Sequence, residues 1–165
     1  MGRKRQQGFT LVELLISMCI AAILGSIAIA QMRDYTRRTQ ISEVMMALSS
    51  CKNMVSENYA VLDTAPAAGR WGCEGAATGH FAGTVQTSSD GVIRVSLDNL
   101  DRLVNGRFIY LVPARSDGNT PLTTPDDLGQ TVRAWRCGSD WQPVRNALPA
   151  NCRNDTSSFS GHEFH

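Results

Sequence analysis

Hydrophobic residues are distributed very unevenly along the chain. From Leu14 to Met32, 19 consecutive residues carry no charge, and most of them are Leu, Ile, Ala, Met or Ser. At about 1.5 Å per residue, a helix over this run spans roughly 28 Å, close to the thickness of the hydrocarbon core of a bilayer. The pattern therefore predicts a helix that is apolar on all sides.

Beyond this run, apolar residues continue on one stripe only. Those that recur at, or close to, helical spacing are Ile41, Val44, Met45, Leu48, Cys51, Val55, Tyr59 and Leu62. The charged residues of the same segment lie mostly off this stripe, which is the pattern of an amphipathic helix. We therefore expect one continuous helix with an apolar half and an amphipathic half, the second packed on a globular head.

After position 62 the pattern is that of a loop followed by short strands. Residues 63–83 are rich in Ala, Gly, Thr and Pro, and strands are expected at 84–87, 92–97, 108–112 and 131–137. Asp90-Gly91 predicts a hairpin turn because Gly readily adopts a positive φ, and Pro113 is expected to end the third strand. A long helix followed by a small antiparallel sheet defines an α+β fold.

Composition fits one domain with a real core. The chain has 165 residues, of which 42% are hydrophobic and 19% charged, and this excludes a disordered chain. The net charge of +1 includes Arg3, Lys4 and Arg5; residues 9–165 hold 13 basic and 15 acidic groups, a net charge of −2. Overall charge therefore does not favour a polyanionic partner.

The basic cluster before the apolar run predicts that the N-terminus stays cytoplasmic and the rest faces the opposite side. Three interpretations are open at this point: a cleavable secretory signal, a plain membrane anchor and a specialised exported helix. Ala28-Ile29-Ala30 fits the cleavage site of the first. The uncharged run is, however, longer than the apolar region of ordinary secretory signals.

Glu13 is a carboxylate at the entrance of the apolar run, where a charge is rare without a partner. It is either hydrated at headgroup depth or paired with a cation at the same depth. Cleavage between Gly8 and Phe9 would supply that cation, because a new α-amino group would start the helix four residues before Glu13. Within one chain this amine could approach its own Glu13. In a filament of staggered helices it would instead neutralise Glu13 of a neighbour and set the axial register.

The segment from Gly8 to Leu14, Gly-Phe-Thr-Leu-Val-Glu-Leu after a basic leader, resembles the class III signal of type IV pilins. The similarity continues through residues 27–35 and Trp71-Gly72-Cys73-Glu74. The resemblance implies that a prepilin peptidase cleaves after Gly8 and methylates Phe9, and that Glu13 is the assembly carboxylate. It divides the chain into a leader (1–8), a transmembrane and assembly helix (9–62) and a globular head (63–165).

The same resemblance implies a structural subunit that polymerises with its own copies into a type IV pilus, for adhesion, twitching motility or DNA uptake. Its expected partners are the prepilin peptidase and the pilus assembly machinery. Its expected location is the inner membrane before assembly and then an extracellular pilus on the bacterial surface. The alternatives are a minor pilin that binds DNA or a surface, and a type II secretion pseudopilin.

Of the five cysteines, Cys19 lies in the apolar run and is interpreted as a small hydrophobe. Cys51, Cys73, Cys137 and Cys152 allow three pairings, and the sequence alone does not choose among them. Local closure favours Cys137–Cys152, worth about 3 kcal/mol in a polymer estimate, and leaves Cys51–Cys73. The resemblance strengthens the C-terminal pair, because pilins close a terminal loop in this way. The spacing lacks the C-x-x-C of zinc sites.

Catalysis, metals and cofactors have little support in the sequence. The tail His162-Glu163-Phe164-His165 is one residue short of a metalloprotease motif, and we expect it to be solvated. One basic and aromatic cluster could contact nucleic acid, with an ordinary protein surface as the alternative interpretation. Its members are Arg133, Trp135, Arg136, Trp141, Arg145 and Arg153.

Overall fold

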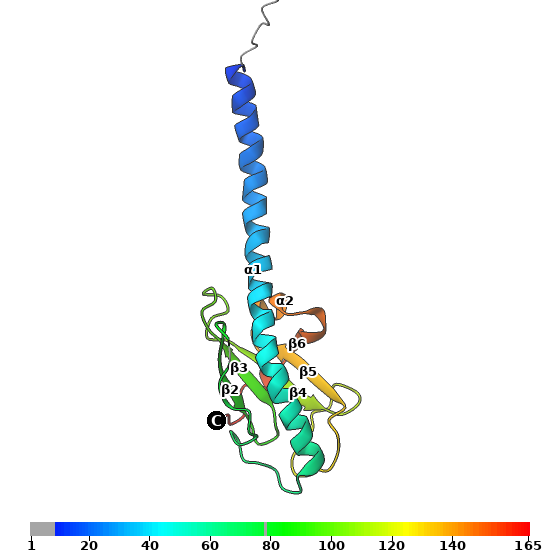
Figure 1. Cartoon of the computed structure of the whole chain (residues 1–165). Coiled ribbons are helices and arrows are strands. Elements are labelled where there is room, and N and C mark those ends of the chain that lie inside the picture. Colours follow the sequence, from blue (N-terminus) through cyan, green and yellow to red (C-terminus); the bar gives the residue numbers. More distant parts are fainter. Residues whose placement is uncertain (1–8, 78) are drawn as a thin grey trace, which may run out of the picture. The chain divides into compact units, whose positions relative to one another are not determined.

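The computed structural model describes residues 9–77 and 79–165, so the leader (1–8), including Gly8, lies outside the described residues. Its elements are α1 (Leu11–Val61), β1 (Gly75–Ala76), β2 (Ala82–Thr87), β3 (Ile93–Leu97), β4 (Phe108–Ala114), β5 (Ala134–Ser139), α2 (Gln142–Ala147), the 3-10 turn η1 (Ala150–Cys152), β6 (Asn154–Asp155) and the 3-10 turn η2 (Ser157–Phe159) (Figure 1). A long helix followed by a sheet confirms the predicted α+β fold.

The chain divides after Thr36 into two compact units. The described part of the first unit contains the apolar half of α1. Its large apolar side chains, from Phe9 to Met32, are between 54% and 81% exposed. By length and composition, this helix is able to cross a membrane.

In the second unit, the six strands form one sheet in their sequence order, and each strand pairs with the one before it (Figure 1). All pairs are antiparallel except β5 and β6. The predicted hairpin joins β2 to β3 through Ser88 and Val92, whose backbone N–H and carbonyl are 2.9 Å apart. Gly91 has φ of +67°, and a Cβ there would lie 2.9 Å from Val55 Cγ1, so both backbone conformation and packing require glycine.

The amphipathic half of α1 packs on one face of this sheet. Six residues of the predicted stripe are at most 1% exposed: Ile41, Val44, Leu48, Cys51, Val55 and Tyr59. They share a hydrophobic core with alternate residues of β3 and with Ile109 and Leu111 of β4. The stripe is therefore confirmed from Ile41 to Tyr59, although Met45 is only partly buried. Leu62 is also half-buried and lies just beyond the end of α1.

The C-terminal tail covers the opposite face of the sheet, so the expectation of a solvated tail is wrong for Phe164, whereas Glu163 and His165 are exposed. The buried residues of this second cluster are Val92, Tyr110, Val112, Phe159 and Phe164. Arg94 adds to it, because its guanidinium lies 4.1 Å from the ring of Phe164 and 4.6 Å from that of Phe108. The aromatic residues of the tail dock because they exclude water from strand side chains that α1 cannot reach.

The expected strand limits shift by a few residues, and Pro113 lies inside β4 instead of ending it. Pairing between β3 and β4 stops at Leu111, so no β3 carbonyl needs the N–H that Pro113 lacks. The carbonyl of Pro113 accepts a hydrogen bond from the N–H of Leu122 (2.9 Å). The two-residue strands and the six-residue α2 were not among the predicted elements, because such short segments carry no measurable period.

Candidate functional site

The N-terminal end of α1 carries the residues predicted to act in processing and assembly. Phe9 is 81% exposed and lies four positions before Glu13. Thr10 caps the helix, because its Oγ1 accepts the backbone N–H of Glu13 (3.3 Å). Thr-Leu-Val-Glu is a capping-box sequence, and an acid in the first turn also suits the helix dipole. This cap is a feature that the sequence reasoning missed, although its spacing indicates it.

The carboxylate of Glu13 lies among apolar side chains and has no ion-pair partner within residues 9–77 and 79–165. Leu11, Val12 and Leu14 around it are 80%, 66% and 56% exposed. This end of the helix therefore offers one negative charge on an otherwise apolar surface. Such an arrangement can accept one cation at a defined height when the surface is covered.

Two disulfides fix the head. Cys51 of α1 is bonded to Cys73 in the following loop, and Cys137 of β5 is bonded to Cys152 of η1. These are the pairs that local closure favoured, with sequence separations of 22 and 15. Cys19 is a free, exposed thiol in the apolar half of α1.

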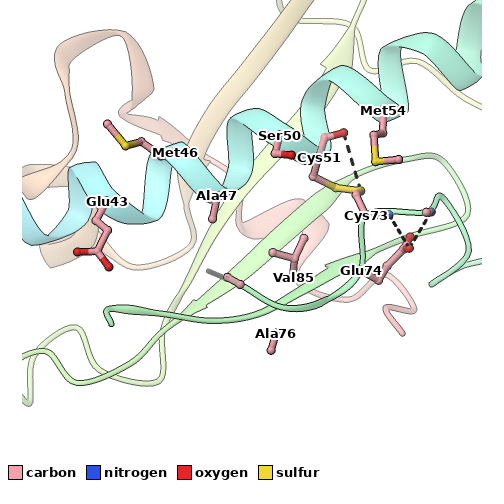
Figure 2. A pocket seen from close by; sticks show the side chains of 12 residues that line it. Glu43, Met46, Ala47, Ser50, Cys51, Met54, Cys73, Glu74, Ala76 and Val85 are labelled. Carbon is pink, nitrogen blue, oxygen red and sulfur yellow. Dashed lines mark hydrogen bonds between the residues drawn. A yellow bond between two sulfur atoms is a disulfide. The ribbon is translucent and has the colours of Figure 1, made fainter. Parts of the chain in front are cut away.

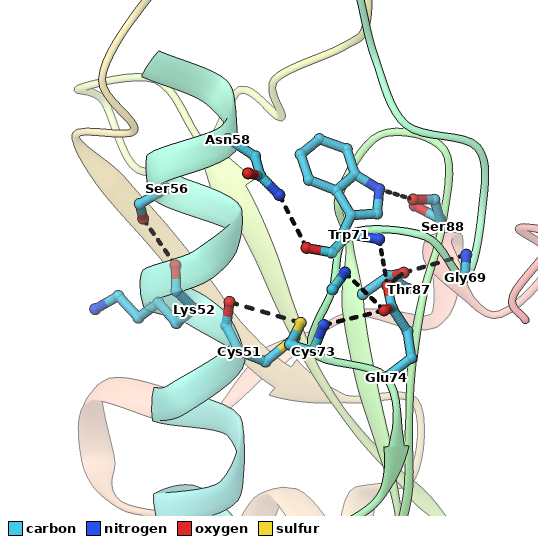
Figure 3. Close-up of a disulfide and its surroundings, with 11 residues drawn as sticks. Cys51, Lys52, Ser56, Asn58, Gly69, Trp71, Cys73, Glu74, Thr87 and Ser88 are labelled. Atoms are coloured by element: carbon cyan, nitrogen blue, oxygen red, sulfur yellow. Dashed lines mark hydrogen bonds between the residues drawn. A yellow bond between two sulfur atoms is a disulfide. The ribbon is translucent and has the colours of Figure 1, made fainter. Parts of the chain in front are cut away.

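The loop that Cys73 anchors is organised around the carboxylate of Glu74 (Figure 3). One oxygen accepts the backbone N–H of Trp71 (2.6 Å) and the hydroxyl of Thr87. The other oxygen accepts the N–H groups of Gly72 (2.8 Å) and Cys73 (3.0 Å). Burial alone would raise the pKa of Glu74, but together these hydrogen bonds outweigh it and lower the pKa below its ordinary value.

Trp71 connects this loop to the helix and to the β2–β3 turn (Figure 3). Its ring is 1% exposed and stacks on Tyr59, with the ring centroids 5.3 Å apart. Its indole N–H donates to the carbonyl of Ser88 (2.8 Å), and its own carbonyl accepts the amide N–H of Asn58 (2.9 Å). The Trp-Gly-Cys-Glu segment is thus a structural clamp between α1 and the sheet.

A groove lies between α1 and the segment around β1 (Figure 2). Its lining includes Met46, Met54 and the Cys51–Cys73 disulfide. Both of its carboxylates already accept backbone N–H groups: Glu74 as described, and Glu43 from His80 at 2.5 Å. The groove therefore has no free acid–base pair among the described residues. Among all the residues that the structure describes, no group of three or more His, Cys, Asp or Glu side chains could hold a metal ion.

Three of the four arginines in the suggested nucleic-acid cluster hold the C-terminal disulfide loop together. Arg136 donates to the carbonyl of Asp155 (2.8 Å). Arg145 donates to the carbonyl of Ser139 (2.9 Å) and lies 3.4 Å from the carboxylate of Asp155. Arg153 donates to a backbone carbonyl of the same loop (2.9 Å).

Of these four arginines, only Arg133 is exposed and forms no hydrogen bond or ion pair with the described residues. The two tryptophans are also separated in their contacts. Trp135 lies 6.0 Å from the ammonium of Lys52, whereas Trp141 stacks under the guanidinium of Arg107 at 4.1 Å. The structure thus does not gather the cluster into one free cationic surface.

A long helix that is apolar in one half, a disulfide-linked α+β head and a carboxylate near the start of the helix are together features of the pilin class of proteins. The family described as Pilin (bacterial filament) matches residues 37–153, and the Prokaryotic N-terminal methylation motif matches residues 3–29. The chain therefore belongs to the type IV pilin family, whose members are structural proteins and not enzymes.

Similar proteins occur in several bacteria. The type IV major pilin protein PilE of Neisseria gonorrhoeae is 28% identical over 91% of this chain and 95% of its own length. A fimbrial protein of Neisseria meningitidis serogroup B is 31% identical, over 93% of this chain and 83% of its own length. The fimbrial protein EcpC of Eikenella corrodens is 29% identical, over 93% and 95% of the two chains.

Proposed function

We propose that this chain is a subunit that polymerises with its own copies into a type IV pilus. The observation that carries the proposal is the apolar half of α1, which exposes large hydrophobic side chains on all sides and has Glu13 near its start. A soluble monomer rarely exposes so large an apolar surface. The methylation motif over residues 3–29 supports a helix that is processed for assembly.

The proposal assigns a role to each part of the chain. Residues 1–8 are the leader, 9–62 the transmembrane and assembly helix, and 63–165 the head. A prepilin peptidase cleaves between Gly8 and Phe9 and methylates the new amine of Phe9. The subunit then waits in the inner membrane until the pilus machinery adds it to an extracellular filament.

In the filament, the amine of Phe9 pairs with Glu13 of a neighbouring subunit. The apolar surroundings give this pair its importance, because a charge buried there without a partner is strongly unfavourable. A helix that is displaced along its neighbour by one turn would separate the pair while keeping most apolar contacts. The ion pair therefore selects one axial register.

The mass of the mature protein from cells tests the processing step. We expect a chain that begins at Phe9, heavier by one methyl group and lighter by the four hydrogens lost in two disulfides. A chain that begins at Gln31 would instead show an ordinary secretory signal and would refute the filament proposal.

Glu13→Ala and Glu13→Gln test the assembly step. Insertion and cleavage should persist in both variants, since the basic leader and the cleaved bond are unchanged. Sheared surface filaments should be few or absent in both, because neither side chain neutralises the buried amine. Glu57→Gln, which removes an exposed acid elsewhere on α1, is the matched control and should assemble normally. Normal piliation of both Glu13 variants would show that Glu13 is only a hydrated residue at headgroup depth.

Glu13→Gln also separates pairing from helix capping. Gln can take the place of Glu in a capping box, so a purely capping role predicts that Gln restores filaments and Ala does not. A role in charge pairing predicts that both variants fail.

We place this chain among filament-building subunits and not among DNA-binding minor pilins. The similar proteins are major pilins or fimbrial proteins by name, and this supports the assignment. Arg136, Arg145 and Arg153 are engaged by backbone carbonyls of their own loop, which leaves little free cationic surface there. High abundance in sheared filaments is expected, and salt-dependent DNA binding by the purified chain would instead favour the minor-pilin role.

A further inference from the structure

The second unit exposes an aromatic and aliphatic surface that the proposed function does not use. Leu103, in the turn between β3 and β4, is 58% exposed, and Trp141, just before α2, is 39% exposed. The indole N–H of Trp141 donates to the carbonyl of Leu103 (3.0 Å). Because the only polar atom of the indole is bound within the head, the exposed remainder of its ring is apolar.

Two guanidinium groups border this apolar pair. Arg107 stacks on the ring of Trp141 at 4.1 Å, and the exposed Arg102 precedes Leu103 in the same turn. Neither arginine forms an ion pair within the described residues. We call Arg102, Leu103, Arg107 and Trp141 the Trp141 surface.

The kind of partner that the Trp141 surface fits depends on its net charge, and therefore on the carboxylates near it. Asp101 is paired with Arg37 at 2.6 Å, and Asp140 is adjacent to Trp141 in the chain, so the surface carries little net charge. A nearly neutral surface does not attract a polyanion by charge alone. An indole ring, an aliphatic side chain and arginines beside them are instead the combination found where proteins meet the membrane–water interface.

The covalent chain limits how far this surface can lie from the membrane. The ion pair with Asp101 ties the turn to Arg37, which follows Met32, the last residue of the uncharged run, by five positions. Five residues reach at most about 18 Å even when fully extended. If the uncharged run spans the membrane, as the proposed function requires, the turn stays near the bilayer surface.

We propose that the Trp141 surface contacts the phospholipid headgroup region of the membrane while the subunit awaits assembly. The ring and Leu103 enter the interface, and Arg102 and Arg107 bind phosphate oxygens. Because the helix tethers the head to the same bilayer, a weak contact is sufficient for high occupancy. The inference rests on the proposed function, since it requires a subunit that is inserted in a membrane.

A second copy of the chain is the other partner to consider. The apolar half of a neighbouring α1 would cover Trp141 and Leu103, but its one carboxylate, Glu13, is paired with the amine of Phe9 in the proposed filament, so no charged acceptor remains for the two arginines. Burying guanidinium groups without acceptors is unfavourable, whereas phosphate oxygens satisfy them directly. The observations therefore favour phospholipid.

The test uses the full chain in nanodiscs that contain one copy each, made with phospholipids brominated close to the headgroup or with unbrominated ones. Bromine quenches an indole only at contact distance. Trp135→Phe leaves Trp71, which is 1% exposed, and Trp141 as emitters. We expect about a twofold loss of Trp141 emission in the brominated discs, as for an interfacial tryptophan. Trp135→Phe with Trp141→Phe leaves Trp71 alone and should show no loss.

A second variant alters the Trp141 surface and keeps Trp141 itself as the fluorescent reporter. Leu103→Ser with Arg102→Gln and Arg107→Gln should remove most of the quenching, whereas Arg70→Gln, an exposed arginine in the loop after α1, should leave it unchanged. Equal emission in both kinds of disc, from a chain that co-purifies with them, would overturn the inference and leave the proposed function intact. Emission that changes only with two copies per disc would assign the surface to a subunit contact. Failure of the chain to enter discs would refute the proposed function itself.

Discussion

Replacing Glu74 with Gln should loosen the loop that Cys73 ties to α1. In the native head, each carboxylate oxygen of Glu74 accepts two hydrogen bonds, three of the four from backbone N–H groups. Gln has the same shape but turns one oxygen into an NH₂ group. The NH₂ group is itself a donor and cannot accept the two hydrogen bonds that the oxygen in its place accepts. At least two hydrogen bonds are therefore lost.

The magnitude follows from the exposure of these donors. A hydrogen bond to a charged group is worth about 1.5–3 kcal/mol, but water can replace a bond at the surface. Trp71 is 1% exposed, whereas Gly72 is exposed, so we expect Gln to keep its oxygen toward the Trp71 N–H and to lose the bonds from Gly72 and Cys73. We therefore expect Glu74→Gln to lower the free energy of unfolding by about 2 kcal/mol and the Tm by roughly 4–8 °C.

The same substitution should change how stability depends on pH. The folded-state pKa of Glu74 lies below its ordinary value of 4.5, because its hydrogen bonds outweigh burial. Its ionised form therefore stabilises the head above about pH 4.5, and this contribution is lost as the pH falls through the lowered pKa. Glu74→Gln cannot titrate, so the difference in stability between the two proteins should shrink in acid.

Thermal unfolding of the full chain in detergent, followed by circular dichroism at neutral pH and near pH 3, measures both effects. Glu57→Gln removes an exposed carboxylate from α1 and is the control, with an expected change in Tm of less than about 1 °C. An equal Tm for Glu74→Gln and the native chain at neutral pH would refute the idea that this carboxylate organises the loop. A difference that persists undiminished in acid would refute the assignment to its charge.

Two further perturbations test the C-terminal part of the head. Replacing Cys137 and Cys152 with Ser should lower the free energy of unfolding by about 3 kcal/mol and reduce surface pili, while peptide mapping still shows cleavage after Gly8. Phe164→Ala should cost about 2–3 kcal/mol in denaturant unfolding, because the ring is 8% exposed and packs near Tyr110; an unchanged midpoint would show that the tail does not dock.

Local periodicity predicted the features that depend on local geometry. The stripe on α1 was predictable because apolar residues at helical spacing must share one face. The β2–β3 hairpin was predictable because Asp90-Gly91 supplies the positive φ that its turn needs. Local closure indicated both disulfides, since it joins cysteines that lie 22 and 15 positions apart.

The main error was the expectation of a solvated tail. The sequence of β4 already indicated that a second segment covers the sheet. Phe108 to Val112 are apolar without alternation, which is typical of a strand covered on both faces. Because α1 covers only one face, another segment had to cover the second. Phe159 and Phe164 supply that cover, but no local pattern in the tail shows which surface they meet.

The roles of the arginines could not be read from spacing for a different reason. A guanidinium binds phosphate oxygens and backbone carbonyls with the same donors, so composition does not separate the two partners. Arg136 meets the carbonyl of Asp155 because the chain returns beside β5, where β6 pairs with β5 and Cys152 is bonded to Cys137. This contact depends on the tertiary fold, and the spacing of residues along the chain does not reveal it.

The apolar half of α1 and Glu13 make different contributions to assembly. Thirteen large apolar side chains from Phe9 to Met32 are more than half exposed, and covering them stabilises the proposed filament, relative to separate subunits in water, by on the order of 15 kcal/mol. That free energy exceeds the stability of many whole domains, but it is nearly independent of register because the helix is apolar on all sides. A single buried, unpaired charge costs several kcal/mol, which is enough to reject every register but one. We infer that hydrophobic contact holds such subunits together and that the one carboxylate determines how they align.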